Sequence, residues 1–295
     1  MLPIDRKIIQ LYDHFTHGGM DRRAFMERLT RLAGSAGAAA AMLPLLQNDY
    51  ARAETVKADD PRLVSSDVEV PGSDAGLKGY LVAAKGGEKR PALVMIHENR
   101  GLNPHIRDMT RRAALAGYLT LGIDALSPEG GTPADEDRAR EMIGRLNPED
   151  ATRRIAAAVR FLAGHPQSTG KVGAMGFCWG GGQVNRVAGI EPMLGAGIAY
   201  YGSQLPAERV EGIRAALMLH YAGKDDRINA GIPAYKTALE RAGKTFELHM
   251  YDGVDHAFNN DTNAARYNAA AAGLAWQRSL DFLGKHLGKP PAAGR

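Results

Sequence analysis

Residues 171–182 read KVGAMGFCWGGG, a short apolar run that leads into a cysteine flanked by glycines. The run predicts a buried strand that ends at the cysteine, and the residues after it predict a helix over 180–188. The five residues GFCWG therefore have the form glycine-x-nucleophile-x-glycine at a strand-to-helix turn. Side chains two positions away on either side would collide with such a sharp turn or with its helix. The pattern predicts a nucleophile elbow, with Cys178 as the nucleophile and Gly176 and Gly180 as the elbow glycines.

A purely structural role is the alternative for Cys178, because cysteine is often buried and glycine-rich turns also bind phosphate. Neither G-x-G-x-x-G nor G-x-x-x-x-G-K-[ST] can be aligned with the turn, and no G-x-S-x-G occurs in the chain. Cys178 is also the only cysteine, so it cannot form an intrachain disulfide. The thiol is either buried and inert or kept for chemistry.

On both sides of this turn, apolar runs rich in Val, Ile and Leu alternate with stretches of helical periodicity. This alternation predicts an α/β fold, a doubly wound and mostly parallel sheet in one domain over residues 54–295, with its site beyond the carboxyl ends of the strands. The expected strands are 67–70 and 77–83 as an opening hairpin, then 92–97, 118–123, 171–177, 195–201, 215–221 and 245–251. The expected helices are 104–116, 136–145, 150–163, 180–188, 233–242 and 264–286.

An elbow nucleophile on such a sheet needs an acid after a late strand and a histidine after the last one. Asp225 follows the expected strand ALMLHY, and His256 follows FELHMY. His256 would take the thiol proton, and Asp225 would fix the orientation of its ring. Each residue alone could be a turn former or a surface group. Asp226 is a rival for the acid role and Asp255 a weaker one.

These residues resemble the dienelactone hydrolase family of the α/β-hydrolase fold, over about residues 65–287. The resemblance rests on HENRGLN, GFCWGG, GKDD and DHAF. It implies a hydrolase that opens a small-molecule ester or lactone through an acyl thioester on Cys178, with His256 as base and Asp225 as its orienting acid. It further implies that Glu98 hydrogen-bonds the resting thiol and helps to form the thiolate. The backbone amides of Asn99 and Trp179 would form the oxyanion hole.

Substrate recognition departs from the family pattern. Characterised members hold the lactone carboxylate with two arginines, where this chain has Asn260 and the pair Ser127 and Pro128. The arginines that could substitute are Arg100, Arg138, Arg145 and Arg227. A general short-chain carboxylesterase or thioesterase is therefore an alternative function, and a non-catalytic thiol redox or binding protein is a second.

The first 53 residues predict a signal peptide of the twin-arginine type. Arg22 and Arg23 precede an uncharged run over 32–46 that is too short to span a bilayer comfortably, and a small-x-small sequence ends at Ala53. The export machinery would then be a partner, and the protein would be periplasmic or secreted, or cytoplasmic if the signal is not used. Asp21 and Glu27 depart from the export pattern. The alternative is that residues 1–50 form two helices of the fold, the first an amphipathic helix over 2–15.

Composition and charge exclude other classes of function. Lys and Arg number 37 against 33 Asp and Glu, and aromatic residues make up 6%. This small and dispersed excess of positive charge predicts no nucleic-acid partner. The pair His97-Glu98 lacks the second histidine of a zinc hydrolase, so no metal or cofactor is expected, and His97 is predicted to be structural. A monomer is the default expectation.

Overall fold

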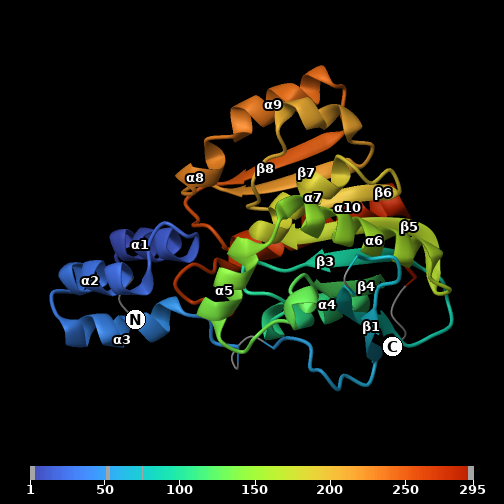
Figure 1. The fold of residues 1–295 in the computed structure, drawn as a ribbon. Helices are drawn as coiled ribbons and strands as arrows, with labels where there is room; N and C mark the ends of the chain where they lie inside the picture. The colour runs from blue at the N-terminus through green and yellow to red at the C-terminus, as the bar shows by residue number, and fades with distance from the viewer. Residues whose placement is uncertain (1–3, 51–53, 75, 292–295) are drawn as a thin grey trace.

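The computed structural model describes residues 4–50, 54–74 and 76–291. Its centre is one eight-stranded sheet with the order β1-β2-β4-β3-β5-β6-β7-β8 (Figure 1). The strands from β3 to β8 run parallel, whereas β2 is antiparallel to β1 and to β4. The expected α/β fold with a mostly parallel sheet is confirmed. The strands are β1 (Leu63–Glu69), β2 (Lys78–Ala84), β3 (Arg90–Ile96), β4 (Leu119–Asp124), β5 (Ser168–Phe177), β6 (Leu194–Tyr200), β7 (Ala216–Ala222) and β8 (Phe246–Tyr251).

Helices cover both faces of the sheet, as a parallel sheet requires. Helices α6 and α7 pack on one face, and α4 and α10 pack on the other. Most helix bounds lie within two residues of the expected ones. The helices of this domain are α4 (Pro104–Leu115), α5 (Glu136–Arg145), α6 (Pro148–Gly164), α7 (Trp179–Ala188), α8 (Asp226–Asn229), α9 (Ile232–Arg241) and α10 (Ala269–Leu287), with 3₁₀ turns η1 (Ser127–Glu129) and η2 (Ala207–Gly212).

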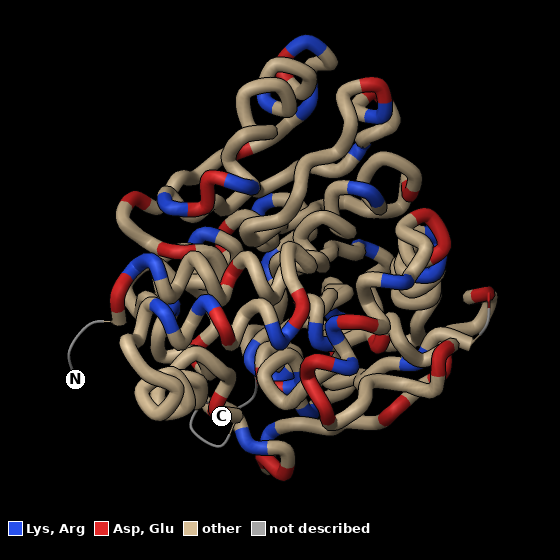
Figure 2. The backbone as a smooth tube through the Cα atoms, turned by 60° about the vertical axis from the view of Figure 1, so that its left-hand side comes forward, with Lys and Arg blue, Asp and Glu red and all other residues tan. Residues whose placement is uncertain are grey.

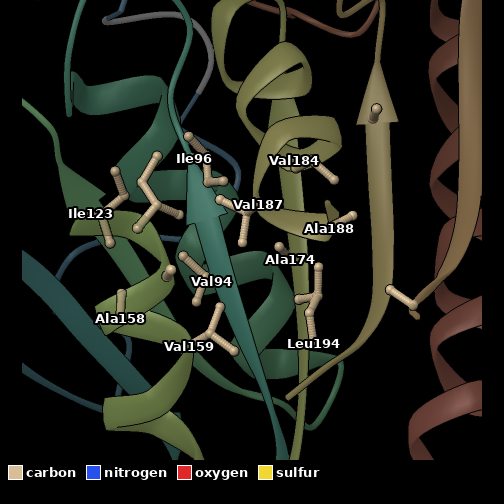
Figure 3. Packing of buried hydrophobic residues seen from close by; sticks show 14 of the residues in the cluster. Val94, Ile96, Ile123, Ala158, Val159, Ala174, Val184, Val187, Ala188 and Leu194 are labelled. Atoms are coloured by element: carbon tan, nitrogen blue, oxygen red, sulfur yellow. The ribbon is translucent and has the colours of Figure 1, made fainter. Parts of the chain in front are cut away.

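The core explains why the central strands read as continuous apolar runs. Successive side chains of β3 point to opposite faces, so that Val94 and Ile96 belong to one buried cluster and Leu93 and Met95 to the other. Figure 3 shows Val94 and Ile96 between the sheet and the side chains of α6 and α7. Because both faces are buried, this strand has no polar alternation.

Two boundaries lie four residues or more from the expected ones. The first strand begins at Leu63, four residues before the expected start. The sequence pattern missed these residues because the side chains of this strand are mostly exposed and show no clear apolar pattern. The closing helix begins at Ala269, where the Asn268 side chain accepts a hydrogen bond from the Ala271 amide and caps the helix. Residues 257–268 before it form turns, which lie beside the candidate site.

Residues 6–46 form three helices with a core of their own: α1 (Arg6–Thr16), α2 (Arg22–Ala33) and α3 (Ala36–Leu46). Phe15 and Phe25 stack with ring centroids 4.5 Å apart, and both are almost fully buried. The three helices gather at one side of the sheet, near α5 (Figure 1). We call this segment, residues 6–46, the cap.

The cap contains most of the stretch that predicts an export signal. Asp21 accepts a hydrogen bond from the Ala24 amide and caps α2, which Arg22 and Arg23 begin. The predicted cleavage site after Ala53 lies outside the described residues. Among the described residues no single helix has the length and apolar character of a membrane span; α2 and α3 reach them only together, as a pair bent by 111°. Export stays a prediction.

Charged residues of both signs alternate over the described molecule (Figure 2). Each of several arginines pairs with a nearby carboxylate, for example Arg186 and Arg209 with Glu149. The dispersed charge that the sequence predicts is therefore present in the fold as well.

Candidate active site

The site lies at the carboxyl ends of four parallel strands. Glu98 follows β3, Cys178 follows β5, Asp225 follows β7 and His256 follows β8. All four side chains are at least nine-tenths buried. The structure therefore brings together the four side chains that the sequence predicts, from positions far apart in the chain.

Cys178 occupies a strained turn between β5 and α7, with φ 54° and ψ −113°. A Cβ atom on Gly176 would lie 2.2 Å from the Gly180 carbonyl oxygen, and one on Gly180 would lie 2.5 Å from the carbonyl oxygens of Ile96 and His97. Neither approach is sterically possible, so the two glycines are required by the turn. The elbow predicted from the sequence has the geometry expected of it.

His256 and Asp225 form a buried pair. His256 Nδ1 lies 2.5 Å from Asp225 Oδ2, which fixes the proton on Nδ1 and directs Nε2 into the site. His256 Nε2 is buried and has no hydrogen-bond partner among the described residues. Burial opposes the charged ring, but the charges of Cys178, Asp225 and Asp13 raise the pKa of His256 to about 9.

Asp225, and neither of the rival carboxyls, is the residue that pairs with His256. Burial would raise the pKa of Asp225, but the His256 charge and hydrogen bond hold it below its usual value. Asp226 is exposed and begins α8, while Asp255 lies 4.0 Å from Lys224 Nζ. The Asp225 side chain also accepts a hydrogen bond from the Ile228 amide of α8. The carboxyl is therefore held between α8 and His256.

Glu98 has partners other than the thiol. Its Oε2 accepts a 2.8 Å hydrogen bond from Asn260 Nδ2, and its Oε1 accepts a 3.4 Å hydrogen bond from the Tyr201 hydroxyl. Among the described residues, no hydrogen bond joins Glu98 to Cys178, so the contact expected in the resting enzyme is absent. Asn260, which replaces a family arginine, thus serves to hold Glu98.

Tyr201 is a site residue that the sequence analysis missed. Its backbone has φ 38°, and its ring centroid lies 4.9 Å from that of His256. Burial and the charges of Glu98 and Cys178 raise the pKa of its hydroxyl well above the usual value. Tyr201 therefore remains a neutral hydrogen-bond donor to Glu98.

His17 is the second missed residue, and it comes from the cap. Its Nε2 lies 3.3 Å from Cys178 Sγ, and its ring makes an edge contact with the His256 ring at 4.7 Å between centroids. The thiol that was expected to contact Glu98 contacts His17 instead. The sequence offered one weak signal: His17 follows Asp13 by four residues, just beyond the end of the amphipathic helix predicted over 2–15.

A cavity of about 300 Å³ opens onto the thiol, a size suited to a small molecule. Asn99 and Trp179, the expected sources of oxyanion-hole amides, both line it. The remaining walls come from the cap, α5 and the loops after β6 and β7. The lining residues are Thr16, His17, Gly18, Asn99, Arg140, Ile143, Gly144, Cys178, Trp179, Tyr201, Ser203, Arg227 and Ile228.

Of the four candidate arginines, only Arg227 lines this cavity, and its side chain is 45% exposed. Arg100 is buried and pairs with Glu136 at 3.0 Å, while Arg138 and Arg145 are exposed on α5. Arg140, which the sequence did not single out, also lines the cavity, but it donates a hydrogen bond to the Phe15 carbonyl oxygen.

His97 is structural, as predicted. Its Nδ1 lies 2.6 Å from the Glu98 carbonyl oxygen, its Nε2 accepts from the Ala125 amide, and burial lowers its pKa. His17, Cys178 and His256 are the residues whose ligand atoms could hold a metal ion, within 4.8 Å of one another, among the described residues.

Comparison with known proteins identifies the main domain. A sequence model described as "Dienelactone hydrolase family" matches residues 77–287, and a separate one described as "YqhI-like" matches residues 3–34. A protein of Methylorubrum extorquens named "Putative carboxymethylenebutenolidase" is 28% identical over 244 residues, which cover 78% of this chain and 84% of that protein.

Solved structures show the same fold. The dienelactone hydrolase of Anabaena variabilis superposes with a TM-score of 0.60 at 23% identity, covering 77% of this chain and 99% of that one. The dienelactone hydrolase-like promiscuous phosphotriesterase P91, from metagenomic libraries, superposes with a TM-score of 0.67 at 22% identity, covering 77% and 100%. The predicted enzyme class, a carboxylic ester hydrolase, is confirmed, and the chain belongs to the dienelactone hydrolase family.

Proposed function

We propose that this enzyme hydrolyses a small ester or lactone through an acyl thioester on Cys178, with His256 as general base and Asp225 as its orienting acid. The observation that carries the proposal is the buried His256–Asp225 pair. Its Nε2 has no partner among the described residues, and a ring nitrogen of His256 lies within 4.8 Å of Cys178 Sγ. Members of the family share the fold, but the nucleophile and its partners are inferred here from geometry.

The reaction begins with transfer of the thiol proton to His256 Nε2. The Sγ electron pair then forms a bond to the substrate carbonyl carbon, and the carbonyl oxygen becomes an oxyanion that the amides of Asn99 and Trp179 stabilise. As the carbon–oxygen bond breaks, His256 returns the proton to the leaving oxygen. Water, deprotonated by His256, attacks the thioester and releases the acid, and the proton returns to Sγ.

Arg227 supports a substrate that carries a carboxylate. It lines both the cavity at the thiol and the neighbouring one at Asp225 and His256, and its guanidinium is half exposed. Asp13 Oδ2 lies 4.0 Å from its Nε, the limit of an ion pair, so the guanidinium keeps donors for a substrate. A lactone bearing a carboxylate is therefore the substrate class that we favour over a neutral ester.

For Glu98 we propose a switch role. In the resting enzyme Tyr201 and Asn260 hold its carboxylate beside the site. Entry of an anionic substrate would displace this buried carboxylate toward the thiol, where it would assist ionisation. Glu98→Gln should then change the rate of thiol alkylation.

The test is hydrolysis of cis-dienelactone and of 4-nitrophenyl acetate, each followed by acid quenching and measurement of the intact protein mass. We expect faster turnover of the lactone and an acyl adduct that is absent from Cys178→Ala. Turnover of the acetate alone would keep the thiol mechanism and assign neutral esters. Absence of cysteine-dependent turnover and of any adduct would reject the proposal in favour of a non-catalytic thiol protein.

Export through the twin-arginine stretch is an alternative proposal for residues 1–53, since Arg22 and Arg23 stand before an uncharged run. Cleavage after residue 53 would remove the three helices of the cap. The test of export is the mass of the protein isolated from periplasm and from cytoplasm. A chain that begins after residue 53 in the periplasm supports export, whereas a full-length cytoplasmic chain rejects it.

A further inference from the structure

Two histidine–aspartate pairs converge on one thiol. His256, oriented by Asp225, is the first. His17 is the second: its Nε2 is 3.3 Å from Cys178 Sγ, and its Nδ1 lies 2.7 Å from the Asp13 carbonyl oxygen and 3.2 Å from Asp13 Oδ1. In this structure the hydrogen-bond contact to Sγ comes from His17, while His256 Nε2 has no such partner among the described residues.

The surroundings of His17 fix its tautomer. Both Asp13 atoms near Nδ1 are acceptors, so Nδ1 carries a proton. A neutral ring then has its lone pair on Nε2 and accepts the S–H proton, and a charged ring donates from Nε2 to a thiolate. In either state the His17 ring is a partner for Cys178 Sγ.

Asp13 is placed to stabilise a positive charge on this ring. Burial would raise its pKa, but interactions with His17, His256 and Arg266 hold the pKa well below the usual value, so the carboxyl is ionised. Arg266 Nη1 lies 3.5 Å from Asp13 Oδ1 and is itself buried. The half-buried Asp13 carboxylate therefore lies where it can compensate a positive charge on the His17 ring.

The cap is fastened to the loops around the site. Asn99 Nδ2 donates a 2.7 Å hydrogen bond to the Thr16 carbonyl oxygen, next to His17. Arg140 donates to the carbonyl oxygen of Phe15 and lies 4.2 Å above its ring. At the other end of the cap, Asn263 Nδ2 donates a 2.7 Å hydrogen bond to the Leu46 carbonyl oxygen.

We propose that His17 is a second catalytic histidine, which takes the Cys178 proton in the resting enzyme, and that the cap is a permanent part of the active site. This inference rests on the proposed function, because it presumes that Cys178 is the nucleophile. The separate match of residues 3–34 to a family model of their own is consistent with a defined module at this place.

The proton step is balanced within the chain. The S–H bond of Cys178 breaks, a bond forms between the proton and His17 Nε2, and Asp13 compensates the imidazolium charge. In this scheme His17, in place of His256, accepts the thiol proton, so the thiolate is ready before substrate enters. His256 is itself protonated at neutral pH because its pKa is raised to about 9. It gives its proton to the leaving oxygen and regains one from the attacking water. Preparing the thiolate is the role that the family resemblance assigns to Glu98.

The test compares His17→Gln with His165→Gln, a histidine at the end of α6 away from the site. Iodoacetamide alkylation of the single cysteine at about pH 6 reports the thiolate, because a free thiol is almost fully protonated there. We expect His17→Gln to lower the alkylation rate about tenfold or more, Asp13→Asn to lower it by a smaller factor, and His165→Gln to leave it unchanged.

Two controls keep the inference falsifiable. Circular dichroism and thermal melting show whether each variant folds, and hydrogen exchange over residues 6–46 shows whether the cap stays docked. Unchanged alkylation in a folded His17→Gln with a docked cap overturns the role of His17. If Cys178→Ala retains hydrolysis, the proposed function fails instead.

The mass of the chain isolated from its native cell tests the second half of the inference. Active enzyme that retains residues 6–46 supports a permanent cap. Active enzyme that begins after residue 53 overturns it, and supports export.

Discussion

The main domain and the cap are held in place by different kinds of contact. The main domain buries aliphatic side chains on both faces of its sheet, with Val94 and Leu93 in opposite layers. The cap has only a small aromatic core around Phe25, and it reaches the main domain largely through hydrogen bonds and ion pairs at the loops after the strands. The sheet thus positions the elbow and the His256–Asp225 pair, while the more weakly packed cap places His17 3.3 Å from the thiol.

The largest expected effects separate the two histidines. Cys178→Ala and His256→Ala should each lower kcat/KM for hydrolysis by at least about 10³-fold, because the triad acts as a unit. His17→Ala should cost less, roughly 10- to 100-fold, since it loses only the prepared thiolate. Steady-state kinetics on folded variants measures this. Equal losses of kcat/KM for the His256 and His17 variants would contradict the different roles assigned to these two histidines.

Matched truncations test whether the two regions unfold separately. Phe25→Ala in the cap and Phe282→Ala in the main domain each remove an almost fully buried ring, a change that typically costs about 3–5 kcal/mol. We expect Phe25→Ala to increase hydrogen exchange over residues 6–46 and leave the sheet protected. Phe282→Ala should lower Tm for the whole domain. A single cooperative transition weakened equally by both would show that cap and domain fold as one unit.

The two regions should respond to opposite ends of the pH scale. The pKa of His256 is raised from 6.5 to about 9, so the stability it contributes is fully present below about pH 6.5 and is lost as pH rises toward 9. The pKa of Asp13 is lowered, so its contribution is present above 3.8 and is lost as pH falls below that value. Urea unfolding across pH should show an alkaline loss that disappears in His256→Gln. An alkaline slope unchanged in that variant would contradict the assignment.

For Asp13, hydrogen exchange is the better measurement, because the carboxyl stabilises the cap rather than the sheet. Acid should release residues 6–46 before the sheet loses protection. Asp13→Asn should show this release at neutral pH already, while Arg23→Gln, on the exposed side of α2, serves as the control. Simultaneous release of cap and sheet would count against a separate role for Asp13.

The smallest expected effects concern substrate binding by Arg227 and the proposed switch role of Glu98. Arg227→Gln should raise KM for a carboxylate-bearing lactone several-fold and leave KM for 4-nitrophenyl acetate unchanged, because only the lactone has a charge to bind.

Glu98→Gln should alter the rate of thiol alkylation by less than His17→Gln does, since Glu98 has no direct contact to the thiol in the described structure. A larger effect from Glu98→Gln would return the resting role to Glu98.

Much of the main domain could be predicted from sequence, because its strands are buried on both faces and its site residues follow them directly. Cys178, Asp225 and His256 each follow a recognisable strand. The sequence could favour Asp225 over Asp226 but could not decide between them. The carboxyl that faces His256 is determined by how the loop turns into α8.

The missed residues have a common cause. Tyr201 and His17 act through contacts across the fold, and His17 is 161 residues away from Cys178 in the chain. The uncharged run and paired arginines of residues 22–46 fit both a signal peptide and two short helices, because Ala-rich apolar sequence suits either. Only the docking contacts, made by residues far away in the chain such as Asn99, Arg140 and Asn263, show what the segment touches.

Those docking contacts also set an order of events during synthesis. The cap leaves the ribosome first, yet Asn263, which holds Leu46, is made 217 residues later, roughly ten seconds or more at ordinary translation rates. Asn99 and Arg140, which hold the other end of the cap, are made well before it. The cap is therefore fastened at its two ends at different times, and a chain that ends before Asn263 would leave the Leu46 end of the cap unfastened.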